Sequence, residues 1–269
     1  MKKLFTLLLI SFPFFIQAQS SADWFDSGHT KYEKKDYSGA IYDYTQYLAS
    51  EPNDDAALFN RGLAYYYSDK YYSAAADFRK VTTIKSDDYE AYYYLGLSLF
   101  ETDDYEGSIT AYNDCIYYNS SYNNAYFDRG FSKYKLERFE SAITDYTRYI
   151  NNVTVEDPDA FYNRGLCYHE LEQYYSALAD YKKATELDNE DEDAWYNLGY
   201  TYNDLKDYSN AINAYKKVLE LNDEASDAWY ELGYAYNKKG DIDEACYAWK
   251  KSAALGYESA KTSVNTYCK

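Results

Sequence analysis

Histidine, proline and methionine are scarce in this chain of 269 residues, and their scarcity limits the chemistry that it can perform. The two histidines, His29 and His169, are far apart in the sequence, and no two cysteines have the close spacing of a zinc site. The sequence also has no phosphate-binding loop and no nucleophile placed beside a base. We therefore expect a protein that is not an enzyme and that uses neither a cofactor nor a metal ion.

Long apolar runs are also missing, except for one next to the N-terminus. Lys2 and Lys3 precede an apolar run at residues 4–16, which is followed by Gln17-Ala18-Gln19. This order of charge, apolar run and small residue is typical of a secretory signal peptide, and the run is too short to cross a bilayer of ~30 Å. We expect residues 1–19 to be removed from an exported bacterial protein that is periplasmic or secreted. The alternative is an anchor that is retained.

Basic residues are outnumbered by acidic ones. The chain has 27 lysine and arginine residues against 45 aspartate and glutamate residues, which gives a net charge of −18. Phosphate groups and anionic lipid repel such a chain. We therefore expect no nucleic acid partner and no membrane insertion, and we favour a cationic protein or peptide. The alternative is that the acidity only keeps an exported protein soluble.

A period of 34 residues, with one step of 35, fills the rest of the sequence. Each period has a glycine, a small residue twelve positions later and an aromatic residue four positions after that. A glycine inside a helix costs about 1 kcal/mol relative to alanine, so its recurrence needs a reason. We expect each glycine to face the small residue and let two helices approach closely. The glycines are Gly28, Gly62, Gly96, Gly130, Gly165, Gly199 and Gly233, and the aromatic residues are Tyr44, Phe78, Tyr112, Tyr146, Tyr181, Tyr215 and Trp249.

Residues 192–223 show the repeat most clearly. Trp195, Leu198, Gly199 and Tyr202 share one face of a first helix, and a second amphipathic segment follows a short turn. The pattern W-x-x-L-G-x-x-Y…A-x-x-x-F resembles the tetratricopeptide repeat. This resemblance implies an all-α fold, a right-handed α-solenoid of seven helix hairpins over residues 21–255, with a capping helix at 256–269. Lys31 and Lys133, which replace the tyrosine three positions after the glycine, are mild departures from the pattern.

Two columns of the repeat vary together. The residue before the glycine is arginine in three repeats whose residue before the second-helix aromatic is aspartate, and it is leucine in three repeats where that second residue is alanine. Duplication of repeats without contact could leave the same pattern. We predict instead that the two columns touch and form ion pairs within each repeat. The pairs are Arg61 with Asp77, Arg129 with Asp145, and Arg164 with Asp180.

Cys246 and Cys268 lie at similar distances on either side of Gly256. An antiparallel hairpin centred on this glycine would bring the two thiols near each other. An exported protein permits a disulfide bond, so we predict one between these two residues.

In tetratricopeptide proteins the first helices of the repeats line the concave face, and the resemblance places a ligand groove there. Its residues here are aromatic and acidic, which suits an extended basic peptide. We therefore expect an exported protein–protein interaction scaffold that binds such a segment. The alternatives are a structural part of an envelope assembly that uses its lateral surfaces, and a glycan-binding module. The predicted groove residues are Phe59, Tyr93, Phe127, Tyr162, Tyr196 and Tyr230, then Tyr66, Phe100 and Tyr134, and the acids Glu90, Glu101, Asp159 and Asp193.

Overall fold

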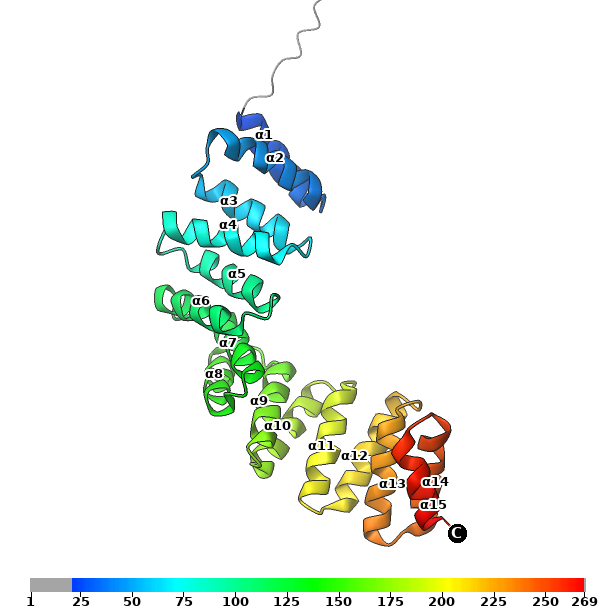
Figure 1. Ribbon diagram of the computed structural model, residues 1–269. Helices are drawn as coiled ribbons and strands as arrows, with labels where there is room; N and C mark the ends of the chain where they lie inside the picture. Colours follow the sequence, from blue (N-terminus) through cyan, green and yellow to red (C-terminus); the bar gives the residue numbers. More distant parts are fainter. Residues whose placement is uncertain (1–20, 269) are drawn as a thin grey trace, which may run out of the picture. The chain divides into compact units, whose positions relative to one another are not determined.

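The computed structural model describes residues 21–268, so the predicted signal peptide lies outside the described residues. The described part falls into two compact units, one ending at Ser86 and one beginning at Asp87. The first unit has four helices (Figure 1): α1 (Ser21–Glu33), α2 (Tyr37–Ser50), α3 (Asp55–Tyr66) and α4 (Tyr71–Ile84). The second has α5 (Tyr89–Phe100), α6 (Tyr105–Tyr118), α7 (Asn123–Lys135), α8 (Phe139–Asn152), α9 (Pro158–Glu170), α10 (Tyr174–Leu187), α11 (Glu192–Asp204), α12 (Tyr208–Leu221), α13 (Ser226–Lys239), α14 (Ile242–Ala254) and α15 (Glu258–Tyr267).

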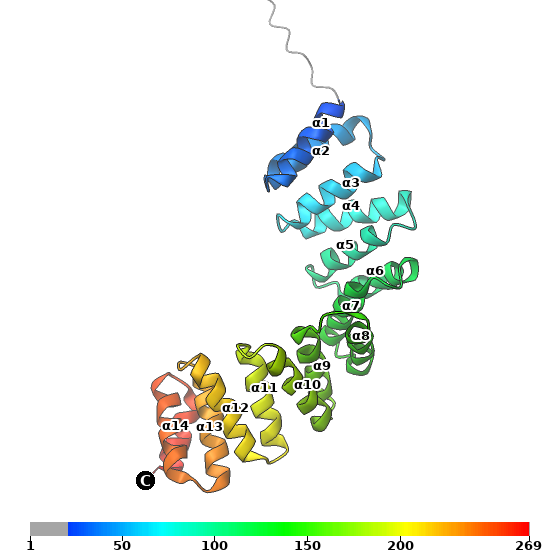
Figure 2. The same cartoon turned by 180° about the vertical axis from the view of Figure 1, so that it is seen from behind.

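Each repeat is one antiparallel helix hairpin. The odd-numbered helix is its first helix, the even-numbered helix is its second, and α15 follows the seventh hairpin. Within the second unit, the second helix of one repeat packs on the first helix of the next, as Figures 1 and 2 show from opposite sides. The predicted all-helical fold is confirmed, and residues 21–268 contain no strand. None of the helices described is both long and apolar enough to cross a membrane.

The recurring glycine has an aromatic side chain, and not the small residue, as the nearest neighbour of an added Cβ atom. In every repeat it faces the ring of the aromatic residue on the second helix. A Cβ atom added at Gly96 would lie 2.5 Å from Tyr112 Cε1, and one at Gly199 would lie 2.9 Å from Tyr215 Cε1. The rings are fully buried, so each glycine makes room for the largest side chain of the repeat core. Packing of that ring offsets the low helix propensity of glycine.

The turn inside each hairpin requires one residue with a left-handed backbone. Six repeats use a residue with a side chain there, such as Lys206 with φ 62°, and the seventh uses Gly240 with φ 91°. The turn after α11 closes with hydrogen bonds from Lys206 N to Asn203 O and from Asp207 N to Tyr202 O, each 2.9 Å long. These bonds satisfy carbonyl groups at the helix end and fix the reversal of the chain.

The last helix covers the end of the seventh repeat. Helix α15 packs against α14, and the disulfide between Cys246 and Cys268 joins them with Cα atoms 5.5 Å apart. The buried ring of Trp249 lies 5.4 Å from the ring of Tyr267, measured between centroids. Helix α15 thus covers part of the seventh hairpin through its contacts with α14. The two remaining cysteines, Cys115 and Cys167, are buried and free.

Candidate binding surfaces

The three ion pairs predicted from the covarying columns are present. Each joins a first helix to the second helix of the same repeat. In the fifth repeat, Arg164 Nε donates to Asp180 Oδ2 at 2.7 Å, and Nη2 donates to Oδ1 at 2.8 Å. The pair of Arg61 with Asp77 and that of Arg129 with Asp145 have the same two-pronged geometry. The aspartates are buried, so each charge-assisted pair lies at the boundary between the repeat core and the surface.

Two lysines that the sequence analysis treated as mild departures also pair with these aspartates. Lys31 Nζ lies 2.6 Å from Oδ2 of the fully buried Asp43, in the first repeat, which has the aspartate but lacks the arginine. Lys133 Nζ lies 2.7 Å from Oδ2 of Asp145, which therefore has two cations. Burial lowers the pKa of Lys133. The sequence contained a signal for these pairs, because both repeats with this lysine have aspartate before the second-helix aromatic residue.

The predicted aromatic ladder on the first helices is half-buried. Its rings before Tyr230 lie against the buried aromatic ring of their own repeat: in the second unit, the ring centroids of Phe127 and Tyr146 are 5.6 Å apart, and those of Tyr196 and Tyr215 are 5.8 Å apart. In the first unit, Phe59 lies on Phe78 in the same way, at 5.5 Å. The ladder residues thus contribute to the core as well as to the first-helix surface. The remaining members, Tyr93, Tyr162 and Tyr230, are half-buried too.

Some ladder hydroxyls bond to the next repeat of the second unit. Tyr93 Oη donates to Asp128 Oδ2 at 2.8 Å, and Tyr162 Oη accepts from Asn197 Nδ2 at 3.2 Å. Near the helix ends, His169 Nε2 and Asp204 Oδ2 are 2.9 Å apart. The first-helix face is therefore held together by polar contacts between repeats.

Asp128 and Glu231 are acids of this face that the sequence analysis missed. Burial raises the pKa of Asp128 to about 6, against the lowering effect of the Tyr93 hydrogen bond. Burial also raises the pKa of Glu231 to about 7, and its only described hydrogen bond comes from Asn203 Nδ2 at 3.3 Å. Both acids stand two positions before the repeat glycine, where the fifth and sixth repeats have asparagine. That column was the signal that could have found them.

The other predicted groove residues lie along the first helices or at their ends. Phe100 stacks on Phe131 with centroids 5.3 Å apart, and Phe131 in turn stacks on Tyr134 at 6.4 Å. Tyr66, in the first unit, packs edge-on against Tyr71 at 5.5 Å. The predicted acids of the second unit are Glu90, Glu101, Asp159 and Asp193, and they lie at the ends of these helices with at least part of each side chain in contact with solvent.

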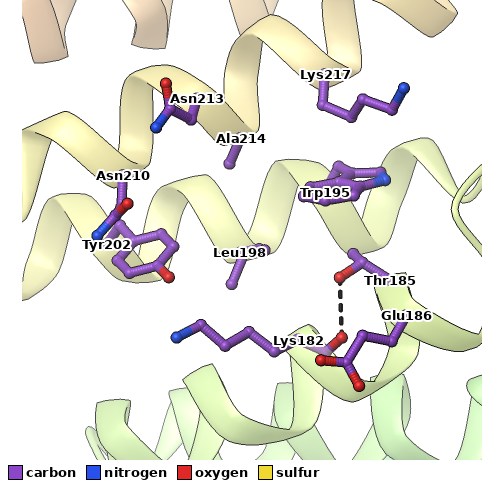
Figure 3. Close-up of a pocket in the computed structure, with 10 residues that line it drawn as sticks. All are labelled: Lys182, Thr185, Glu186, Trp195, Leu198, Tyr202, Asn210, Asn213, Ala214 and Lys217. Carbon is purple, nitrogen blue, oxygen red and sulfur yellow. Dashed lines mark hydrogen bonds between the residues drawn. The ribbon is translucent and has the colours of Figure 1, made fainter.

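The structure also shows a cavity on another face, which the sequence analysis did not predict. It measures about 470 Å³ and lies between α10 and α12, over α11 (Figure 3). Leu198 and Ala214 are nearly buried at its base, and Trp195 and Tyr202 flank them. Trp195 Nε1 donates to Asn189 O at 3.1 Å, which fixes the indole ring. We call this cavity the sixth-repeat groove. The other lining residues are Lys182, Thr185, Glu186, Asn210, Asn213 and Lys217.

The same groove recurs 34 residues later in the second unit. This seventh-repeat groove measures about 480 Å³ and places Trp229, Leu232, Tyr236 and Ala248 at the equivalent positions. In the first unit the equivalent place contains Arg61, and the cavity there is smaller, about 320 Å³. The two columns that vary together therefore set the size and polarity of this groove. No group of residues that could hold a metal ion occurs within the described range of 21–268.

The repeat pattern and the stacked hairpins together define a family. Models of the tetratricopeptide repeat match residues 25–89, 62–123, 158–191, 192–224 and 214–247, which is more than half of the chain. The chain belongs to the tetratricopeptide repeat family. A search of curated proteins by sequence found no match.

Solved structures of similar fold are also tetratricopeptide repeat proteins. The C-terminal part of one from Cytophaga hutchinsonii is 21% identical, with a TM-score of 0.75 over 88% of this chain and 98% of that one. A protein from Parabacteroides merdae is 15% identical, with a TM-score of 0.65 over 93% and 100%. YrrB, described as having an unusual peptide-binding site, is 23% identical, with a TM-score of 0.62 over 68% and 94%. At these identities the likeness establishes the fold.

Proposed function

We propose that this tetratricopeptide scaffold for protein–protein interaction is an exported bacterial protein that binds an extended basic segment on the concave face. The N-terminal sequence pattern supports export, and the net charge of −18 favours a cationic partner. YrrB has the same fold and a peptide-binding site, so peptide binding is compatible with this architecture.

The observation that carries the proposal is the pair of carboxyl groups, Asp128 and Glu231, on the first-helix face of the second unit. Both are half-buried, and no lysine or arginine pairs with either one in the described part of the chain. Burying an unpaired carboxylate is costly, so a cation from a partner would relieve that cost. Aromatic rings beside the acids, such as Tyr93 and Tyr196, can pack on the stem and charge of a lysine or arginine side chain.

Removing the two charges while keeping the shape tests this proposal. The probe is a fluorescent peptide of alternating lysine and proline, and its affinity for the mature chain is measured by anisotropy. We expect the Asp128→Asn, Glu231→Gln variant to bind about tenfold more weakly, a loss of about 1.4 kcal/mol. Wild-type binding should strengthen from pH 5 to pH 8, because both acids lose their protons in that interval.

The matched control is Glu186→Gln, which removes one charge from the sixth-repeat groove instead. It should leave the affinity for the basic peptide unchanged. Equal weakening by the control would mean that only net charge matters. No effect of the double substitution would exclude the first-helix acids as the binding site. Alanine substitution of the ladder is a poorer test, because those rings also pack on the repeat core.

A further inference from the structure

A third column of the repeat changes together with the two that set the groove. In the fifth repeat, Arg164 bonds to Asp180 and also donates from Nη1 to Oγ1 of Thr147, on the preceding second helix, at 3.0 Å. Arg129 donates in the same way to Asn113 at 2.7 Å, and Arg61 to Thr45 at 3.1 Å. In the sixth and seventh repeats, where leucine replaces the arginine, the preceding helix carries a cation in place of the threonine or asparagine. These cations are Lys182 before Leu198 and Lys216 before Leu232.

The sixth and seventh repeats thus carry the cation on the preceding second helix, whereas the fifth repeat carries it on its own first helix. Arg164 Cζ lies 5.9 Å from the ring centroid of Tyr168, and Lys182 Nζ lies 5.4 Å from that of Tyr202, the equivalent ring one repeat later. Lys216 repeats this arrangement over Tyr236 at 5.6 Å.

The aspartate of the pair, however, is replaced by alanine in both of these repeats. Neither Lys182 nor Lys216 has a carboxylate within 4.0 Å in the described part of the chain. Among the other charged groups of the two grooves, Lys217 pairs with Glu220 at 3.0 Å, and Glu186 and Glu244 also line the walls.

We propose that the sixth- and seventh-repeat grooves form a second docking site, for an acidic segment of a partner protein. The segment places one apolar side chain on the leucine–alanine base of each groove and one carboxylate beside each unpaired lysine. Two observations define this occupant. The base of each groove is apolar and flanked by a tryptophan and a tyrosine, and its unpaired cations stand out on a chain of net charge −18. The site shares no residue with the aromatic ladder or with Asp128 and Glu231, and it selects the opposite charge.

A peptide of alternating aspartate and phenylalanine, labelled with a fluorophore, tests the charge preference. We expect it to bind the mature chain, with an affinity that declines as salt rises. The same peptide with asparagine in place of aspartate should bind about tenfold more weakly. Absence of binding, or equal binding of a peptide with lysine in place of aspartate, would overturn the proposal.

The chain supplies its own template for a variant that narrows the groove. Lys182→Thr, Leu198→Arg and Ala214→Asp together copy Thr147, Arg164 and Asp180 of the fifth repeat, so the variant keeps a combination that folds in this protein. We expect about a tenfold loss of affinity for the acidic peptide, with unchanged helicity by circular dichroism. An unchanged affinity would contradict the assignment.

The reverse triple change, Thr147→Lys, Arg164→Leu and Asp180→Ala, should create a third groove and strengthen binding of a longer peptide. Loss of folding cannot explain an increase in affinity for the peptide. Sedimentation of the wild-type chain adds a further outcome. Self-association that the narrowing variant abolishes would make a second copy the occupant, and would overturn the assignment to an acidic partner.

Discussion

The fifth and sixth repeats show how one helix hairpin can support two different surfaces. In the fifth, Arg164 and Asp180 fill the space between neighbouring second helices with a buried ion pair. In the sixth, Leu198 and Ala214 occupy the equivalent positions and line a cavity of about 470 Å³. The glycine–aromatic contact beneath is present in both, between Gly165 and Tyr181 and between Gly199 and Tyr215. Replacing a buried ion pair by apolar residues is often neutral for stability. The surface can therefore vary without cost to the fold.

The largest expected effect comes from breaking only half of the ion pair. Arg164→Ala leaves Asp180 buried without its cation, and we expect a loss of about 3–5 kcal/mol of unfolding free energy. Arg164→Leu with Asp180→Ala imitates the sixth repeat and should stay within about 1 kcal/mol of the wild type. Urea unfolding followed by circular dichroism measures both. Similar losses of unfolding free energy in the single and double variants would show that leucine and alanine cannot replace the ion pair.

The fourth repeat provides an internal control for this test. Asp145 is paired with Lys133 as well as with Arg129. Arg129→Ala should therefore be less destabilising than Arg164→Ala, because a cation remains on the carboxylate. Adding Lys133→Ala should remove that difference.

Removing the disulfide of the last repeat should affect the two ends of the second unit differently. Cys246→Ser with Cys268→Ser opens a link between residues 22 positions apart, and we expect a loss of about 3 kcal/mol. The effect should be local, because each repeat contacts only its neighbours. Hydrogen exchange should quicken in α14 and α15 and stay unchanged in α5 and α6. Uniform acceleration along the unit would show that the disulfide stabilises it as a whole.

The fold could be predicted because a 34-residue pattern recurs with little variation. Helices α1, α3, α5, α7, α9, α11 and α13 begin at Ser21, Asp55, Tyr89, Asn123, Pro158, Glu192 and Ser226, one repeat length apart. The ion pairs could be predicted for a related reason. Two columns that change together identify a contact when the same unit is repeated several times in one chain.

The grooves and the buried acids could not be predicted in the same way. A cavity depends on how three helices from two repeats meet, and no single repeat contains all of its lining residues. The contact of Gly199 with the Tyr215 ring was also missed, because the sequence does not show how far that ring reaches. Asp128 and Glu231 resemble other surface acids in the sequence, and burial, which the sequence does not show, is the largest cause of their raised pKa.

A smaller effect on stability, which depends on pH, is expected in the fourth and seventh repeats. Burial raises the folded-state pKa of Asp128 from 3.8 to about 6, and that of Glu231 from 4.5 to about 7. The folded protein therefore binds more protons than the unfolded one between these values, and stability falls as pH rises through them. Asp128→Asn should stabilise the chain by about 1 kcal/mol at pH 8 and have little effect at pH 4.

Glu231→Gln should act in the same direction, with its midpoint nearer pH 7. Thermal unfolding at several pH values measures both substitutions. Glu190→Gln, which removes one charge from an exposed side chain, is the matched control. A stabilisation that is equal at pH 4 and pH 8 would mean that desolvation of the charge is not its cause.

The smallest expected effect distinguishes the turns of the sixth and seventh repeats. Lys206 adopts φ 62°, whereas Gly240 at the equivalent position of the next repeat adopts φ 91°. A left-handed residue with a Cβ atom costs about 1–2 kcal/mol, and the greater freedom of glycine in the unfolded chain offsets part of any relief. We therefore expect Lys206→Gly to stabilise the chain by only about 0.5 kcal/mol. Gly240→Lys should destabilise it by a similar or greater amount, because its φ lies farther from the left-handed minimum at about 57°. Chemical unfolding of both variants measures the difference. Destabilisation by Lys206→Gly would mean that the lysine side chain stabilises the turn by more than its backbone strain costs.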